Sequence, residues 1–438
     1  MLLPFPARRL HSFFLVIHRR FVWIFLSLLL TVPASAASLA SFCTLRESKD
    51  GVDIAGRDEN RRLPIASVSK LMTAWWGLSV KGLEGRYRTR FHVTPVGDGR
   101  FDVHIEGTRD PYFGKESLHL ALSELHRRGV RRIRLLSFDE GFKFYVNVTS
   151  DFVAASFYTT ASPQPATVLA QLQSMRGLTN GWEQTQREAR ARGVRLINRP
   201  SLPVEEMRFV SRADFAATVE TTDYTLRSAP LSALLKEMNR NSNNHAANQI
   251  FENLGGAAAF SRFALQKLNL GASALSFHNG TGDRIDFPNG ASGYNEATCA
   301  ATLKVLRALR QDLKRLGKDL QDVMPVTGGD ADSSVSKYYE NDETRGSLIG
   351  KTGTVNPSIT LAGLVHTRRG EYLFMYNVST NGTAADWNRG RALIREKITG
   401  LIRELNGGDP IRYTSVSFLS FDQRSVFEVP AADTERLP

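Results

Sequence analysis

Apolar side chains recur at helical spacing in several segments of this 438-residue chain. Between residues 65 and 79 they lie three or four positions apart, at Leu71, Ala74, Trp75 and Leu78. Such positions share one face of a helix, and the pattern ends before Gly82, so we expect a helix with Ser67 at or near its N-terminus. The same spacing predicts further helices at residues 118–125, 231–239, 245–254 and 387–405.

Other segments have the two-residue period of strands. From Arg100 to Glu106, apolar residues alternate with polar ones that include His104, which predicts a half-buried strand. Short apolar runs predict further strands at residues 133–138, 142–148, 359–366 and 372–378, the last two as a hairpin. Because helices and strands occur together at both ends of the chain, we expect an α/β (α+β) fold.

The first 36 residues have the three parts of a secretory signal. Four arginines without an acid precede a short apolar run from Phe21 to Val32, and Pro33-Ala34-Ser35-Ala36 supplies small residues for cleavage. A membrane-spanning helix needs about 20 apolar residues, so an uncleaved anchor is the less favoured alternative. We expect cleavage after Ala36 and a mature protein that is periplasmic or secreted to the cell envelope.

The chain is strongly basic. Its formal net charge is +12, and it falls to +8 when the four arginines of the signal segment are removed. The densest basic cluster consists of Arg127, Arg128, Arg131, Arg132 and Arg134. No aromatic residues lie between these arginines as stacking platforms for bases, so we expect a solvated helix end and strand face and no nucleic acid partner. Attraction to an anionic polymer follows from the net charge.

Two cysteines leave two alternatives open. In an oxidising compartment Cys43 and Cys299 can form a disulfide bond. Cys299 also begins an apolar helical pattern, which is equally typical of a buried free thiol.

Three short motifs carry the candidate chemistry. They occur in the order Ser67-Val68-Ser69-Lys70, Ser242-Asn243-Asn244 and Lys351-Thr352-Gly353-Thr354. On a helix, residues three apart share a face, so Lys70 can reach the Ser67 hydroxyl and accept its proton. A lysine does this only when it is neutral, and burial together with the nearby charge of Lys351 would lower its pKa toward that state.

The other two motifs supply the remaining parts of an acyl-transfer site. Ser242 can relay a proton to a leaving amine, and Asn244 can hydrogen-bond a substrate amide. The segment Lys351-Thr352-Gly353-Thr354, on an expected edge strand, offers a cation and hydroxyls to a terminal carboxylate. The backbone N–H groups of Ser67 and Thr354 would form the oxyanion hole. This chemistry requires neither a metal ion nor a cofactor.

Two further segments repeat the shorter patterns. Ser334-Val335-Ser336-Lys337 repeats the first motif, and Ser379-Thr380-Asn381 repeats the second. Ser334 follows the Ser-x-Asn element and lies in sequence typical of a loop, and Ser379 comes after the Lys-Thr-Gly strand. Because Lys-Thr-Gly occurs once, it and the order of the motifs identify the functional copies.

With their flanking residues, these motifs resemble the class C low-molecular-mass penicillin-binding proteins, which are D-alanyl-D-alanine carboxypeptidases and endopeptidases. Leu63-Pro64-Ile65-Ala66 leads into the serine helix as in that family, and Ser228-Ala229-Pro230-Leu231 leads toward the second motif. Asn279-Gly280-Thr281-Gly282 resembles the family's Asp-Gly-Ser-Gly, although Asn279 replaces the usual aspartate.

This resemblance implies a penicilloyl-serine transferase-like (β-lactamase/transpeptidase-like) domain formed by residues 37–82 and 225–408. One smaller accessory domain is expected at residues 83–224, and the tail at residues 409–438 has no assigned role. Peptidoglycan stem peptides are the implied substrates, cleaved through an acyl-enzyme, and β-lactam antibiotics are the implied covalent inhibitors. The gap of 171 residues between Lys70 and Ser242 is short for the family. A small insert leaves the leaving-group side of the groove open, so we expect endopeptidase as well as carboxypeptidase activity.

Three alternative functions use some of the same residues. A serine β-lactamase would need an added carboxylate to activate water, and no Glu-x-x-Leu-Asn lies between the first two motifs. A penicillin-binding or sensing module that acylates without turnover would retain the same side chains. A metal hydrolase is disfavoured because His104 and Glu106 lack partner ligands and are expected to be exposed strand residues. His245 is expected to face solvent, because Lys70 already supplies the base.

Overall fold

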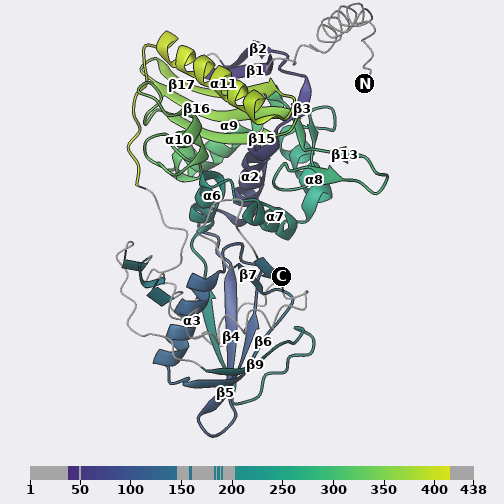
Figure 1. Cartoon of the computed structure of the whole chain (residues 1–438), viewed down its shortest axis with the longest axis vertical. Helices are drawn as coiled ribbons and strands as arrows, with labels where there is room; N and C mark the ends of the chain where they lie inside the picture. Colours follow the sequence, from purple (N-terminus) through teal and green to yellow (C-terminus); the bar gives the residue numbers. More distant parts are fainter. Residues whose placement is uncertain are drawn as a thin grey trace, which may run out of the picture.

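The structure is a computed structural model that describes residues 38–48, 51–145, 157–159, 182–183, 185–187, 189–190 and 203–414. A five-stranded antiparallel sheet lies between two layers of helices in the upper body of Figure 1. In spatial order its strands are β15 (Leu348–Val355), β16 (Ser358–Thr367), β17 (Gly370–Ser379), β1 (Ser38–Ser48) and β2 (Gly51–Arg57). The predicted hairpin is confirmed by β16 and β17.

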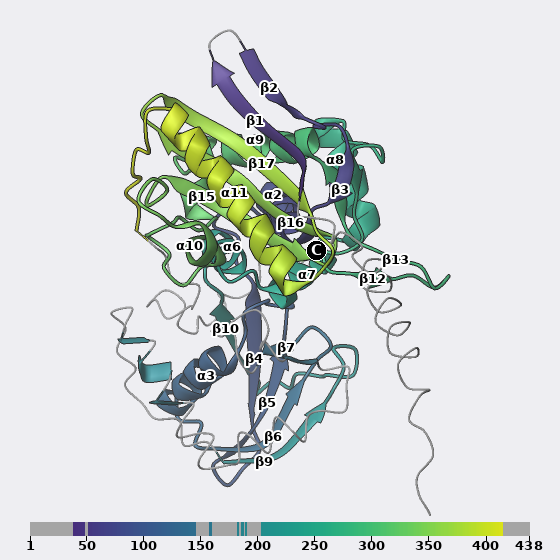
Figure 2. The same ribbon diagram turned by 45° about the horizontal axis from the view of Figure 1, so that its top comes forward.

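Helix α11 (Ala384–Glu404) covers one face of this sheet, as Figure 2 shows. It begins where the Thr383 hydroxyl accepts a hydrogen bond from the backbone N–H of Asp386. Ile394, Ile398 and Ile402 lie four residues apart and pack on the apolar residues of β16 and β17. The periodicity seen in the sequence therefore identified the C-terminal helix, which starts three residues earlier than predicted.

The other face carries the helices around the first motif. Helix α2 (Ser69–Lys81) follows a single turn of 3₁₀ helix, η1 (Ala66–Val68), and is enclosed by other helices on most sides. Its neighbours are α6 (Leu231–Arg240), α7 (Asn244–Asn253), α8 (Gly256–Leu268) and α9 (Cys299–Arg315). The remaining short elements of this body are β3 (Arg62–Pro64), β11 (Leu275–Ser276), β12 (Ile285–Asp286), β13 (Ser292–Gly293), β14 (Glu296–Thr298), η2 (Leu320–Asp322) and α10 (Ser334–Tyr339).

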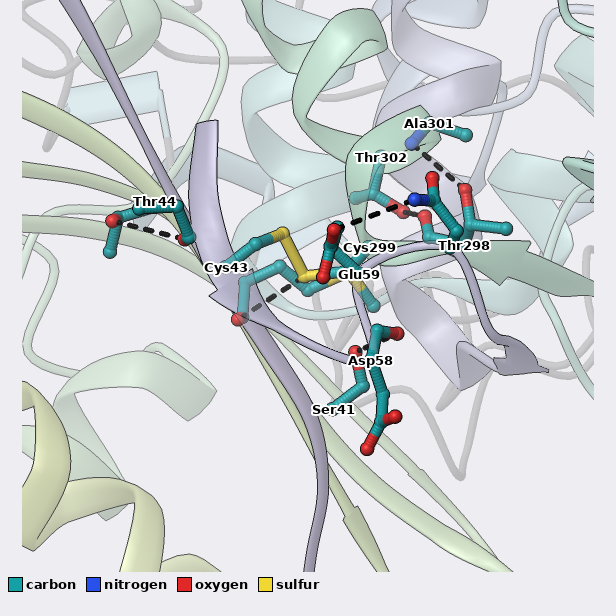
Figure 3. Close-up of a disulfide and its surroundings, with 12 residues drawn as sticks. Ser41, Cys43, Thr44, Asp58, Glu59, Thr298, Cys299, Ala301 and Thr302 are labelled. Atoms are coloured by element: carbon teal, nitrogen blue, oxygen red, sulfur yellow. Dashed lines mark hydrogen bonds between the residues drawn. A yellow bond between two sulfur atoms is a disulfide. The ribbon is translucent and has the colours of Figure 1, made fainter. Parts of the chain in front are cut away.

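A disulfide bond joins Cys43 to Cys299 and decides between the two alternatives for the cysteines (Figure 3). It links β1 of the sheet to the first turn of α9, between residues 256 positions apart in sequence. Both cysteines are buried, so the bond fixes the helical layer on the sheet from within the core.

A second five-stranded sheet lies below the first in Figure 1. In spatial order its strands are β10 (Thr222–Arg227), β4 (Arg88–Pro95), β5 (Arg100–Glu106), β6 (Arg132–Phe138) and β9 (Val204–Phe209). Helix α3 (Lys115–Arg127) connects β5 to the parallel strand β6. A short hairpin of β7 (Lys143–Tyr145) and β8 (Phe157–Thr159) accompanies the sheet. That residues 83–224 form a separate domain stays a prediction.

The polar face of β5 is less exposed than expected: His104 is buried, and Asp102 and Glu106 are half-buried. The ring of Phe215 stacks on that of His104 with centroids 4.0 Å apart, and the Ser137 hydroxyl lies 2.9 Å from His104 Nδ1. His104 is only 3% exposed, because a loop more than 100 residues further along the chain covers it.

Most of the basic cluster near this sheet is engaged in ion pairs. Arg127 and Arg128 pair with Glu124, and the partners of Arg132 and Arg134 are Glu205 and Asp102.

Several expectations lie partly or wholly outside the described residues. They include the predicted signal segment 1–36 and the part of the tail from residue 415 onward. The strand predicted at 142–148 is described only over β7. Among the described residues, none of the helices has the length and the apolar character that crossing a membrane requires.

We predict that loss of the disulfide destabilises the fold by about 2–4 kcal/mol, because closing so long a loop restricts the unfolded chain. Cys43→Ala, Cys299→Ala and the double variant should lose equal amounts, since each removes the same bond. Denaturant unfolding of the three variants measures these losses. Losses that add in the double variant, or an unchanged unfolding midpoint, would contradict a stabilising bond.

Candidate active site

Ser67 lies in the turn that opens α2. The residue before it, Ala66, is fully buried and has a φ of +48°, a left-handed conformation that costs energy for a residue with a side chain. One helical turn after Ser67, Lys70 is fully buried, with Nζ 2.9 Å from Ser67 Oγ. The structure therefore brings the serine and lysine of the first motif into hydrogen-bonding contact.

The ammonium group of Lys70 is surrounded by neutral acceptors. Its Nζ donates to Asn244 Oδ1 at 2.7 Å and to the Thr281 carbonyl oxygen at 3.3 Å. Within the described residues no carboxylate forms an ion pair with it. Burial lowers the pKa of Lys70 to about 7, and the charge of Asp283 opposes this shift. A large fraction of Lys70 is thus neutral near neutral pH.

The second motif forms the turn between α6 and α7. Ser242 has a φ of +53°, and Asn243 caps α7 by accepting from the backbone N–H of Ala246 at 2.9 Å. Asn244 Nδ2 donates to Asp283 Oδ2 at 2.8 Å, while its Oδ1 accepts from Lys70. Both ends of this amide are engaged, and each keeps one further hydrogen-bonding position for a ligand.

The third motif lies on β15, at the edge of the first sheet. Lys351 is fully buried, and its Nζ donates to Ser242 Oγ at 2.9 Å and to the Thr352 carbonyl oxygen at 2.8 Å. Burial, and secondarily the charge of Lys70, lower the pKa of Lys351 well below its usual value. We expected burial and the charge of Lys351 both to lower the pKa of Lys70. Burial does lower it, but the charge of Lys351 is not among the causes, and it is at Lys351 that the charge of the other lysine contributes.

A groove of about 410 Å³ joins the three motifs. Residues of all three line it, namely Ser67, Ser242, Thr352, Gly353 and Thr354. Other lining residues come from the end of α6, from α10 and the segment before it, and from α11, including Arg240, Asp332, Ser334, Lys337, Tyr338, Trp387 and Arg391.

The expectation that Ser334 lies in a loop is wrong. It opens helix α10, whose six residues are too few to give a periodic signal in the sequence. Ser334 lines the groove, with its Oγ 2.6 Å from Thr352 Oγ1. Lys337, the other end of this repeated pattern, is exposed and lies over the Tyr338 ring, 5.6 Å from its centroid. Ser334 therefore touches the third motif without a buried lysine beside it.

The loop that resembles the family's Asp-Gly-Ser-Gly holds Lys70 from the far side. Asn279 Oδ1 accepts from the backbone N–H groups of Thr281 at 3.0 Å and Gly282 at 2.8 Å, so asparagine serves as the acceptor in the usual position of aspartate. A Cβ on Gly282 would lie 1.9 Å from the Ala66 carbonyl oxygen, so this close approach requires glycine. The contact of the Thr281 carbonyl with Lys70 was missed, because a backbone group leaves no signal in residue identity.

Metal ligation finds no support among the described residues. His, Cys, Asp and Glu side chains form no group of three that could hold an ion in that part of the chain. His104, considered above as a ligand, is stacked on Phe215 in the second sheet.

Comparison with known proteins gives consistent similarities. The model of the D-Ala-D-Ala carboxypeptidase 3 (S13) family matches residues 30–191 and 216–397. The predatory endopeptidase Bd3459 of Bdellovibrio bacteriovorus, in complex with immunity protein Bd3460, is 34% identical with a TM-score of 0.82, over 89% of this chain and 99% of that one. Its penicillin G-acylated form is 35% identical with a TM-score of 0.79, over the same shares of the two chains.

More distant structures share the fold alone. Penicillin-binding protein 4 of Haemophilus influenzae is 15% identical with a TM-score of 0.55, over 83% of this chain and 97% of that one. A comparison with curated protein sequences gives no match.

We predict that Gly353→Ala lowers the free energy of unfolding by about 1–3 kcal/mol. A Cβ there would lie 2.3 Å from Thr360 Oγ1 and 2.9 Å from the Ile65 carbonyl oxygen. The Thr360 side chain cannot move aside freely, because its hydroxyl donates a hydrogen bond to the Ile65 carbonyl oxygen at 3.0 Å. Gly271→Ala is the matched control, since nothing lies within 4 Å of its added Cβ. Equal unfolding midpoints for the two variants would contradict this close packing.

Proposed function

We propose that this chain, which belongs to the D-Ala-D-Ala carboxypeptidase 3 (S13) family, cleaves both the D-Ala-D-Ala ends of stem peptides and the crosslinks between them. Membership of this family confirms the resemblance seen in the sequence and makes the chain a serine D,D-peptidase. The observation that carries the mechanism is the buried Lys70 amine, 2.9 Å from Ser67 Oγ at the base of the groove. The peptidoglycan substrate places this activity in the cell envelope.

Acylation begins with the neutral form of Lys70. Its lone pair accepts the Ser67 proton while Ser67 Oγ attacks the carbonyl carbon of the penultimate D-alanine. The oxygen of the tetrahedral intermediate is stabilised by the backbone N–H groups of Ser67 and Thr354. The Lys70 proton passes to the leaving amine through Ser242, whose hydroxyl is held by Lys351.

Substrate binding assists this step electrostatically. A substrate carboxylate near Lys351, Thr352 and Thr354 stabilises the charged form of Lys351. Charged Lys351 in turn disfavours a second charge on Lys70, because both lysines are buried in one region. A ligand with a carboxylate therefore favours the protonation state of Lys70 that acylation requires. Gly353 lets β15 approach the serine turn, and Asn244 hydrogen-bonds the substrate amide.

Water then hydrolyses the ester bond of the acyl-enzyme, which releases the acyl group and frees Ser67. A β-lactam presents a similar carbonyl and carboxylate, and acylation of the Bdellovibrio endopeptidase by penicillin G supports β-lactams as covalent inhibitors here. Fast release of the penicilloyl group would indicate a β-lactamase, and acylation without peptide turnover would indicate a sensing module.

Two observations support the finer parts of the proposal. Among the similar Bdellovibrio structures is one of a peptidoglycan endopeptidase. The gap between Lys70 and Ser242 is short, 171 residues, and we expect so small an insert to leave few walls on the leaving-group side of the groove. Export after signal cleavage is supported by the composition of residues 1–36 and by the Cys43–Cys299 disulfide, since such bonds persist in oxidising compartments.

We predict that acylation by penicillin slows as the pH falls below about 7, because protonated Lys70 cannot accept the Ser67 proton. The rate constant should fall about tenfold per pH unit once Lys70 is mostly protonated. Adduct formation with a labelled penicillin, followed against pH, measures this dependence. Lys70→Ala should be slow at every pH, and a wild-type rate that is flat from about pH 5 to 8 would contradict the assignment.

The proposed reaction is tested with purified monomeric pentapeptides and crosslinked dimers of peptidoglycan. We expect release of D-alanine from the former and conversion of the latter to monomers. Ser67→Ala should lose both activities, and mass mapping of the penicilloyl adduct should place it on Ser67. Dimers that persist while pentapeptides are trimmed would contradict the endopeptidase part, and an adduct on Ser334 would contradict the motif assignment.

A further inference from the structure

Arg391 occupies a defined position in the wall of the groove. It lies on α11, with one guanidinium nitrogen 3.3 Å from Thr354 Oγ1 and another 3.1 Å from Asn388 Oδ1. Its guanidinium also lies over the Tyr338 ring, 4.3 Å from the centroid. Contacts with Asn388 of its own helix, with Tyr338 of α10 and with Thr354 of the third motif therefore fix the orientation of the guanidinium.

Arg391 differs from neighbouring cations in its charged partners. Within the described residues no carboxylate forms an ion pair with Arg391. Neighbouring cations differ in this respect: Arg389 pairs with Asp386, and across the groove Arg240 pairs with Asp332. A fixed guanidinium without a counter-ion is suited to bind a carboxylate, because it offers several donors in a planar fork.

Lys351 alone is a poor source of positive charge for a substrate carboxylate. It is fully buried, already donates to Ser242 and to the Thr352 carbonyl, and its pKa is lowered by burial. Arg391 is partly exposed to the groove, and a guanidinium keeps its charge throughout the pH range in which proteins are folded. Thr354 Oγ1 accepts from Arg391, so its own O–H stays free to donate to the same ligand.

We propose that Arg391 is a specificity-determining residue, which binds the free α-carboxylate of the residue on the leaving side of the scissile bond, beside Thr352 and Thr354. The inference rests on the proposed function and deepens it. The substrate class it defines is peptides whose leaving amine belongs to an amino acid with a free α-carboxylate. A terminal carboxamide lacks the charge and loses this interaction.

The test compares two N-acylated D-Ala-D-Ala peptides, one with a free carboxylate and one with a terminal carboxamide. Arg391→Gln should lower kcat/KM for the free acid by roughly 10- to 100-fold, and change that for the carboxamide by less than about threefold. The unchanged carboxamide rate shows that the variant folds. Arg391→Lys should recover part of the loss, since it restores the charge without the fork.

Lys337→Gln is the matched control, because it removes one positive charge from the same groove without a contact to Thr354. We expect it to lower kcat/KM for the free acid by less than about threefold. Equal losses for Lys337→Gln and Arg391→Gln would indicate general electrostatic attraction and overturn the inference. It is also overturned if Arg391→Gln impairs both peptides equally or neither. A wild-type protein inactive on both peptides would overturn the proposed function and, with it, this inference.

Discussion

The active site depends on keeping two lysine side chains out of water, and in the part of the chain that the structure describes no carboxylate is in contact with either. Removing a charged amine from water is costly, and a protein ordinarily offsets the cost with an ion pair. Lys236 illustrates that solution, since its buried Nζ lies 2.8 Å from Asp330 Oδ2. Lys70 and Lys351 contact hydroxyl, amide and carbonyl oxygens instead. Neutral acceptors hold these amines in place while leaving the charged form unfavourable, which a proton acceptor requires.

Two costly backbone conformations lie next to these two lysines. Ala66 and Ser242 both have positive φ angles, although neither is glycine. Ala66 immediately precedes Ser67, and Ser242 itself carries a reacting hydroxyl. The packing around each residue compensates for its local strain. Gly353 and Gly282 allow backbone to approach the serine turn from two sides. The seam between the sheet and the helical layer therefore tolerates little change, and the Cys43–Cys299 bond joins the same two layers.

The sequence predicted those parts of the molecule whose signal is local. Long amphipathic helices such as α11 and the β16–β17 hairpin were identified because their periodicity is repeated over many residues. The three motifs were identified because they combine specific residues in a fixed order. The disulfide was left open, because sequence gives no distance between residues 256 positions apart. Burial of His104 was missed because its cover comes from Phe215 in a distant loop.

Arg391 could not be distinguished in the sequence. Helix α11 carries Arg389, Arg391, Arg395 and Arg403, which are alike in a residue string. Only the structure separates them by partner: Arg389 and Arg403 pair with carboxylates, Arg395 donates to the Tyr338 carbonyl, and Arg391 reaches Thr354.

The ion pair of Lys236 and Asp330 joins the two walls of the groove. Lys236 belongs to α6, the helix that leads into the Ser242 turn. Its partner Asp330 also accepts from the backbone N–H of Val326 at 2.8 Å and from the Tyr413 hydroxyl, so it fixes the loop that precedes α10. This buried ion pair thus helps to hold the Ser242 wall to the Ser334 wall, and Tyr413, at the described start of the C-terminal tail, covers it. Among the described residues, Lys236 has a carboxylate partner that makes this region rigid, whereas Lys70 has only neutral acceptors and can therefore accept a proton. A buried lysine can perform either task, and the acceptors around its amine determine which one.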